Sequence, residues 1–454
     1  MQAARVRRMR YRLLPLLLFT ASLAAQPITE TLTVEVIDVP VFVARGGKAV
    51  EGLTRDSFEL YVNGKRQPIE YFEAVDAKAE ASTLRERRLF LLLFDIAFSD
   101  PLTLPRAQRA AAQFIANGSP ADYFAVATYS NRRGVWFAAP FSQDREALTR
   151  AIRSLNNSRS GDPLAIVLTA ADRAEGISSE ALSDITRAPH LRAIEDQMYG
   201  LADVSERLAS LEGQKHIVFM SEGWDGRTRD TMFAPHLTDD LYAMHQRFQA
   251  SGVFLHTLDL EGVANSLMAN DGLFEMSVGT GGKFIHSRND FGKALIDLST
   301  SLDRGYRLGF RPANTKRGYN KIEVKVRNAG RVQVNHRLGF SSQADAKDMG
   351  DGLYLADVVL NDVPQTGTAA TLTLHDGQLS VHIPMREIAA QAPEAELLVY
   401  AFDAQGAALM FHREAINARD GIEKIIEIAV PEGTTVAKAL LRVDKQLGFS
   451  KVNL

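Results

Sequence analysis

The run of six apolar residues from Leu89 to Phe94 places the strongest constraint on the fold, because it shows no alternation with polar residues. A strand that is apolar on both faces belongs inside a parallel sheet that helices cover on each side. Between residues 85 and 303, further apolar strands alternate with helical stretches. Strands are expected at 123–129, 216–220, 253–258 and 283–285, and helices at 106–117, 145–155, 164–174, 191–211, 237–250 and 291–302. The sequence therefore predicts an α/β, Rossmann-like domain with a mostly parallel sheet and helices on both faces.

The segments on either side of this domain have the alternating pattern of β-strands. In residues 26–80, Asn63-Gly64 is a strong signal for a two-residue hairpin turn. Neither this segment nor residues 304–343 has the roughly seven strands of a sandwich, so we expect the two to pair as one split β-sandwich. Two small units packed separately are the alternative. Residues 350–454 predict a C-terminal β-sandwich whose first strand is expected at 353–360.

The first 25 residues have the features of a secretory signal peptide. Five arginines lie between Arg5 and Arg12, and an apolar run follows to Ala25, which fits cleavage after Ala24 or Ala25. The apolar run has about 13 residues, fewer than the roughly 20 that a helix needs to span a bilayer. We therefore expect an exported protein, periplasmic or extracellular, with no transmembrane span in the mature chain. An uncleaved anchor is the alternative.

Charge, cysteine content and missing motifs exclude several classes of function. The chain has 52 basic and 55 acidic residues, and loss of the five N-terminal arginines leaves a formal charge of −8. That balance gives no basic surface for nucleic acid. The absence of cysteine excludes disulfides, thiolate metal sites and a cysteine nucleophile. Gly279 to Lys283 lacks the spacing of a phosphate loop, and no motif of the His-Glu-x-x-His or Gly-x-Ser-x-Gly type occurs, so no nucleotide site and no catalytic residue are assigned.

Three loops of the α/β domain carry side chains that could bind a ligand. They are expected at the carboxyl ends of strands, where open parallel sheets bind their ligands. The first loop begins at Asp95 and contains Ser99, the second contains Asp162, and the third contains Glu222. Carboxylates and hydroxyls gathered at one edge suit a hard divalent cation. In the alternative interpretation, Asp95 caps the following turn and Glu222 is a solvated loop acid.

Several ordered motifs carry a family resemblance. They are Val50-Glu51-Gly52-Leu53-Thr54 followed by Phe58-Glu59-Leu60 and Asn63-Gly64-Lys65, then Leu93-Phe94-Asp95, Lys215-His216-Ile217-Val218-Phe219-Met220-Ser221-Glu222-Gly223, Gly279-Thr280-Gly281-Gly282-Lys283-Phe284 and Tyr306-Arg307-Leu308-Gly309-Phe310. Together they resemble von Willebrand factor A-like domains, and more narrowly the bacterial von Willebrand factor A-related group known chiefly from Acidobacteria. The resemblance runs from about Thr31 to Phe340. It implies a domain that often binds Mg²⁺ at a metal-ion-dependent adhesion site.

The resemblance also implies which residues would form that site. The usual pattern is Asp-x-Ser-x-Ser, with a threonine and an aspartate on two later loops, and Asp95 and Ser99 match it. Ala97 replaces the first serine, Asp162 stands near the place of the threonine, and Glu222 replaces the aspartate. We therefore expect a degenerate site in which Asp95, Ser99, Asp162 and Glu222 hold Mg²⁺ or Ca²⁺, of which Ca²⁺ tolerates irregular geometry better.

The resemblance further implies that a cation held in this way leaves a coordination position for an acidic side chain of a protein partner. Phe98 and Trp224 flank the site and are expected to contact that partner, because aromatic residues are enriched among interface hot spots. Packing of these side chains within their own loops is the alternative. The sequence thus predicts an exported, non-enzymatic protein-binding or adhesion-type module that recognises its partner at the carboxyl edge of the sheet. Two alternatives remain open: a metal-dependent hydrolase that uses the same carboxylates, and a scaffold whose metal site is inactive.

Overall fold

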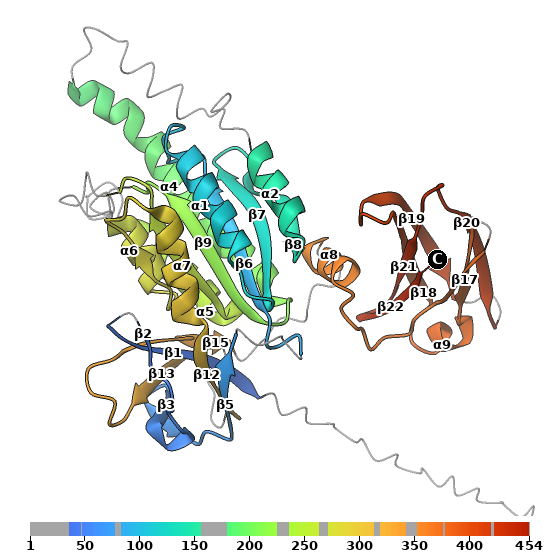
Figure 1. Cartoon of the computed structure of the whole chain (residues 1–454), viewed down its shortest axis with the longest axis horizontal. Coiled ribbons are helices and arrows are strands. Elements are labelled where there is room, and N and C mark those ends of the chain that lie inside the picture. The colour runs from blue at the N-terminus through green and yellow to red at the C-terminus, as the bar shows by residue number, and fades with distance from the viewer. Residues whose placement is uncertain are drawn as a thin grey trace, which may run out of the picture. The chain divides into compact units, whose positions relative to one another are not determined.

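A six-stranded mixed sheet forms the centre of the α/β domain in the computed structural model (Figure 1). Its order is β11-β10-β9-β6-β7-β8, and all neighbours are parallel except β7 and β8. The strands are β6 Arg88–Asp95, β7 Asp122–Ser130, β8 Gly134–Ser142, β9 Gln214–Ser221, β10 Val253–Asp259 and β11 Phe284–Ile285. The structure describes residues 36–46, 48–77, 83–155, 179–224, 236–262, 271–312, 318–341, 352–375, 377–418 and 422–453.

Helices cover both faces of this sheet, which explains why β6 is apolar throughout. Leu89, Leu91 and Leu93 pack into a core shared with α4 and α5, whereas Phe90 and Phe94 pack into a second core shared with α1 and α7. α1 and α7 lie side by side on one face (Figure 1). The helices are α1 Leu104–Ala116, α2 Arg145–Ser154, α4 Ser179–Ala209, α5 His236–Ser251, α6 Asp271–Val278 and α7 Phe291–Leu302. The last of these has the bounds expected from the sequence.

The sheet differs from the expected one at its edge. β8 was not predicted, and its antiparallel pairing with β7 makes the sheet mixed rather than mostly parallel. The reason is that β8 is an edge strand with mostly half-buried residues and an internal Pro140, so it shows neither a continuous apolar run nor a clean alternation. The helix expected at 164–174 lies outside the described residues.

Two further sheets draw strands from both sides of the α/β domain. In the first, β1 Ile37–Arg45 pairs with β12 Arg304–Phe310. In the second, β3 Phe58–Val62 pairs with β13 Tyr319–Val326 and with β4 Lys65–Gln67 across the Asn63-Gly64 turn. The remaining strands are β2 Lys48–Ala49, β5 Tyr71–Asp76 and β14 Gln333–His336 in the first sheet, and β15 Gly339–Ser341 in the second; the short helix η1 Arg55–Ser57 precedes β3. The inward residues of both sheets share one apolar core.

The C-terminal segment contains two antiparallel sheets preceded by a helix. Residues 353–360, expected as a strand, lie in helix α8 Gly352–Leu360, so that expectation was wrong. The buried residues Leu353, Tyr354, Asp357 and Val358 have helical spacing, and a short apolar run does not distinguish strand from helix by itself. One sheet contains β16 Thr371–His375, β17 Gln378–Ile383 and β20 Lys424–Ala429; the other contains β18 Glu394–Phe402, β19 Ala408–Asn417, β21 Val436–Val443 and β22 Gln446–Asn453, and α9 Met385–Ala389 joins the two.

The N-terminal segment assigned to a signal peptide, residues 1–25, lies outside the described residues. In the part of the chain that is described, no helix is both long enough and apolar enough to cross a membrane.

Candidate functional site

The candidate site lies where the chain reverses its direction of travel across the mixed sheet. β6 is followed by β7 on one side, whereas β9 returns to pair with the other side of β6. Such a switch point leaves the loops at the carboxyl ends of the two strands free to diverge, and ligands of open sheets bind there. Because Phe94 pairs with Met220, Asp95 and Ser221 end neighbouring strands at the same edge. The topology therefore brings two of the three predicted loops together.

Asp95 is fully enclosed at this edge, with 0 % of its surface exposed. Its Oδ1 accepts hydrogen bonds from the backbone N–H groups of Ala97 and Phe98, at 2.9 and 3.0 Å. Its Oδ2 accepts from the Ser221 hydroxyl at 2.6 Å and from Gln197 Nε2 at 3.0 Å. Four donors thus surround one carboxylate and tie it to its own loop, to β9 and to α4.

The orientation of Gln197 is set by the indole of Trp224. Trp224 Nε1 donates to Gln197 Oε1 at 3.2 Å. An indole N–H can only donate, so the amide oxygen must face Trp224 and the amide NH₂ must face Asp95. No sequence motif indicates Gln197, because it lies on α4, 102 residues from Asp95 and outside every expected loop.

Ser99 and Glu222 connect the two loops a few residues further on. Ser99 is buried, and its hydroxyl accepts a hydrogen bond from the Glu222 backbone N–H at 3.3 Å. The Glu222 carboxylate accepts from Asp100 N at 3.0 Å and from the Thr103 hydroxyl at 2.8 Å. Since α1 begins at Leu104, Glu222 provides acceptors at the start of that helix, a favourable position for a negative charge. Glu222 is therefore a structural connection between loops, and not a fully solvated acid.

Burial raises the pKa of Asp95 to about 6. The hydrogen bonds from Ser221, Phe98, Ala97 and Gln197 act in the opposite direction, since they stabilise the ionised form. Asp259, which ends the next strand, also has its pKa raised to about 6 by burial. A third carboxylate therefore lies at the same edge, and sequence reasoning missed it because it appeared as the end of an ordinary apolar strand.

The donors around Asp95 do not fit a divalent cation. The lone pairs of the two Asp95 oxygens accept hydrogen bonds from two backbone N–H groups, an amide NH₂ and the Ser221 hydroxyl. The three nitrogen donors have no lone pair to offer an ion, and the hydroxyl directs its hydrogen at the carboxylate. An ion bound there would have to displace one of these donors, and Ala97 offers no side-chain oxygen in exchange. Asp95, Ser99 and Glu222 do meet at one edge, whereas Asp162 lies outside the described residues.

The two aromatic residues expected to contact a partner are both packed within the domain. Trp224 is only 4 % exposed, so the expectation that it contacts a partner is corrected: its ring belongs to the core and its N–H is used by Gln197. Phe98 is half-buried and its ring lies edge-to-face with His190, at 6.0 Å between ring centroids. Leu102, in the described part of the loop after β6, does project from this edge and is 83 % exposed.

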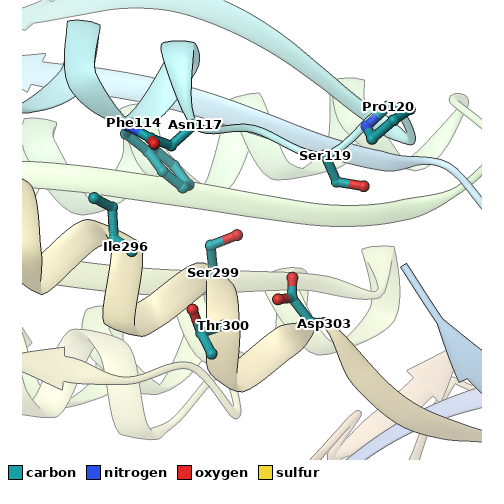
Figure 2. Close-up of a pocket in the computed structure, with 8 residues that line it drawn as sticks. All are labelled: Phe114, Asn117, Ser119, Pro120, Ile296, Ser299, Thr300 and Asp303. Carbon is teal, nitrogen blue, oxygen red and sulfur yellow. The ribbon is translucent and has the colours of Figure 1, made fainter. Parts of the chain in front are cut away.

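A pocket at the other end of α1 offers no competing site. Figure 2 shows it between the end of α1 and α7, with Ser299, Thr300 and Asp303 on the α7 side. Its volume is about 280 Å³. The polar groups at one end have partners already, because Ser119 donates to the carbonyl of Ala77 and Asp303 pairs with Arg88. The pocket therefore carries no assigned ligand.

No protein-family model matches the chain, and no curated protein matches its sequence. Among solved structures, it is similar to an aerotolerance-related membrane protein from Bacteroides fragilis, at 11 % sequence identity and a TM-score of 0.29; the match covers 47 % of this chain and 98 % of that chain. It is also similar to the conserved hypothetical protein BatB from Bacteroides thetaiotaomicron, at 9 % sequence identity and a TM-score of 0.26; the match covers 47 % of this chain and 98 % of that chain. A third similarity is to three N-terminal domains of the type V pili tip protein Mfa5 from Porphyromonas gingivalis, at 9 % sequence identity and a TM-score of 0.28; the match covers 91 % of this chain and 78 % of that chain. At these TM-scores the similarities carry no argument about function.

Proposed function

We propose that this chain is an exported protein-recognition module of the von Willebrand factor A type, which binds a protein partner at the carboxyl edge of its mixed sheet without catalysing a reaction. The proposal keeps the recognition edge expected from the sequence. It departs from that expectation in one respect: recognition does not use a cation at Asp95, because four hydrogen-bond donors already surround that carboxylate.

The observation that carries the proposal is the way in which the loop after β6 is held. Its beginning is fixed by the hydrogen bonds from Ala97 and Phe98 to Asp95, and its end by those from Asp100 and Thr103 to Glu222. Between these anchors the loop presents Leu102, which is 83 % exposed. A loop that is ordered before binding loses little conformational entropy on binding, so an exposed apolar residue on it contributes efficiently to affinity.

The hydrolase alternative gains no support from this geometry. A general acid or base must come within hydrogen-bond reach of a substrate. Asp95 has no exposed surface, and both of its oxygens accept hydrogen bonds from protein donors. The raised pKa of Asp95 is thus explained by its burial as a structural group.

The test is affinity capture from an extract of the source organism's envelope, with the mature protein as bait and the captured proteins quantified. Leu102→Asp should lose the captured partner, because it places a charge at the centre of the proposed contact. Ile422→Asp is the matched control, since Ile422 is an aliphatic residue of similar exposure, 78 %, in the C-terminal segment. Addition of a chelator should leave the capture unchanged.

Two results would contradict the proposal. If Leu102→Asp and the wild-type protein captured the same proteins in the same amounts, the edge would not be the recognition surface. If a chelator abolished capture in the wild-type protein and Asp95→Asn did the same, a cation at Asp95 would be required.

A further inference from the structure

Helices α4 and α5 contact each other on one face of the sheet of the α/β domain. Both helices precede a strand of the parallel part of the sheet, so they run in the same direction. Among the side chains that the structure describes, polar contacts join them between residues 41 positions apart: Glu195 with His236, Tyr199 with Asp240, and Glu206 with Arg247. The last is an ordinary exposed ion pair, whereas the first two lie close enough together to form one group.

That group consists of Glu195, His236 and Asp240. One ligand atom from each side chain lies within 4.8 Å of the other two. His236 and Asp240 are separated by four positions on α5, which places both on the same face of the helix. Glu195 reaches them from α4, and its carboxylate contacts His236 Nε2. The three side chains therefore come from two rigid helices rather than from loops.

The chemistry of this group differs from that around Asp95. Here two carboxylates and one imidazole, which all have lone pairs to offer, face one another, whereas Asp95 faces donors. Metal–ligand bonds of about 2.1 Å in tetrahedral geometry place neighbouring ligand atoms roughly 3.4 Å apart. The ligand atoms of Glu195, His236 and Asp240 lie within 4.8 Å of one another, so small rotations of these partly exposed side chains bring the atoms to that separation. An imidazole with carboxylate oxygens suits a first-row divalent metal such as Zn²⁺.

Tyr199 supports the same assignment from outside the group. Its hydroxyl donates to Asp240 Oδ1 at 3.0 Å, which orients the carboxylate. Ligating carboxylates in metal sites are commonly held by such a hydrogen bond. The side chain of His236 is 50 % exposed and that of Glu195 is 27 % exposed, so solvent can reach the space between them.

We propose that Glu195, His236 and Asp240 form a binding site for a first-row divalent metal ion, with Zn²⁺ the best-suited ion, that Tyr199 positions Asp240, and that water completes the coordination on the exposed side. The site is independent of the hydrogen-bonded group at Asp95 and does not require the function proposed above.

The test is titration of the untagged mature protein, first stripped with a chelator, with Zn²⁺ by calorimetry and with Co²⁺ by visible absorbance. One ion per chain should bind, and Co²⁺ should give the absorption bands of a low-symmetry N/O site. His236→Ala should weaken Zn²⁺ binding by more than tenfold, and Tyr199→Phe by about tenfold, in line with the effect of removing groups that orient ligands.

His382→Ala is the matched control, because His382 also pairs with a glutamate, Glu423 at 3.1 Å, but is not part of a three-ligand group among the described residues. It should leave Zn²⁺ binding unchanged. Circular dichroism of each variant verifies folding, which these partly exposed substitutions should preserve. The proposal would be overturned if the wild-type protein bound neither ion, or if His236→Ala bound both as tightly as the wild-type protein.

Discussion

Replacement of Gln197 by glutamate is a sharp test of the hydrogen-bonded group at Asp95. In the native protein, Gln197 Nε2 donates to Asp95 Oδ2 at 3.0 Å. Gln197→Glu substitutes a second carboxylate of nearly the same shape for that donor. Two buried carboxylates at this separation cannot both ionise easily, so one of them must bind a proton.

The expected loss of stability follows from two contributions. A hydrogen bond to a charged group contributes about 1.5–3 kcal/mol, and each unit by which a pKa is raised further costs about 1.4 kcal/mol at a pH where the group is ionised. Because the pKa of Asp95 is already raised to about 6, a second carboxylate beside it should lower the free energy of unfolding strongly at neutral pH. We expect a loss of about 3 kcal/mol near pH 7.5, of which at least half is regained near pH 5, where a shared proton restores the hydrogen bond.

The assay is urea unfolding in the presence of a chelator, followed by fluorescence of Trp224 in a Trp136→Phe background, since the chain has two tryptophans. Trp224 reports on the site directly because its N–H binds Gln197. Gln197→Met is the control: it loses the hydrogen bond to Asp95, and the one from Trp224 as well, without adding a carboxyl group. It should therefore regain much less stability at low pH. If Gln197→Glu were as stable as the wild-type protein at neutral pH, or if both variants had the same pH dependence, the geometry derived for Asp95 would be refuted.

Two further predictions concern buried ionisable groups outside the candidate site. Burial lowers the pKa of His256 to about 3, so the unfolded protein binds a proton at this histidine below pH 6.5 while the folded protein does not, and the free energy of unfolding falls with pH. Between pH 7 and pH 5, urea titrations should show that the wild-type protein loses about 2 kcal/mol more of this free energy than His256→Gln does. An equal dependence on pH in the two proteins would contradict this. Arg87 and Asp357 form a buried bidentate ion pair. Arg87→Met should therefore lower the free energy of unfolding, measured by heat or urea, by about 3–5 kcal/mol, and adding Asp357→Leu should recover most of that loss. If the double variant recovered nothing, the unpaired carboxylate of Asp357 would not be the cause of the loss.

Features that depend on short-range patterns could be predicted from the sequence. The apolar run of β6 predicted a strand covered on both faces, and Asn63-Gly64 predicted the turn between β3 and β4. In that turn Asn63 and Gly64 have φ values of 50° and 77°, which asparagine and glycine adopt more readily than other residues. Local sequence also placed Asp95 and Glu222 at the ends of strands, where the structure has them.

Features that depend on contacts between distant segments could not be predicted. Gln197 lies on a helix, and nothing in its neighbourhood indicates that it faces Asp95, 102 residues earlier in the chain. Trp224 follows a loop motif that favours exposure, but the tertiary structure buries its ring against α4. The three-ligand group on α4 and α5 has no sequence motif beyond the spacing of His236 and Asp240, because Glu195 joins them only once the two helices pack together.

The central claim is that Asp95 is a hydrogen-bonded structural group that holds the recognition loops without a cation. The most direct test is the titration of its side-chain carboxyl by carbon NMR on aspartate-labelled protein, with Asp95→Asn used to assign the signal. We expect a pKa near 6 that does not change when millimolar Mg²⁺ or Ca²⁺ is added. A pKa that falls well below 4 on addition of either ion would contradict the claim, because it would show a cation bound to the ionised carboxylate.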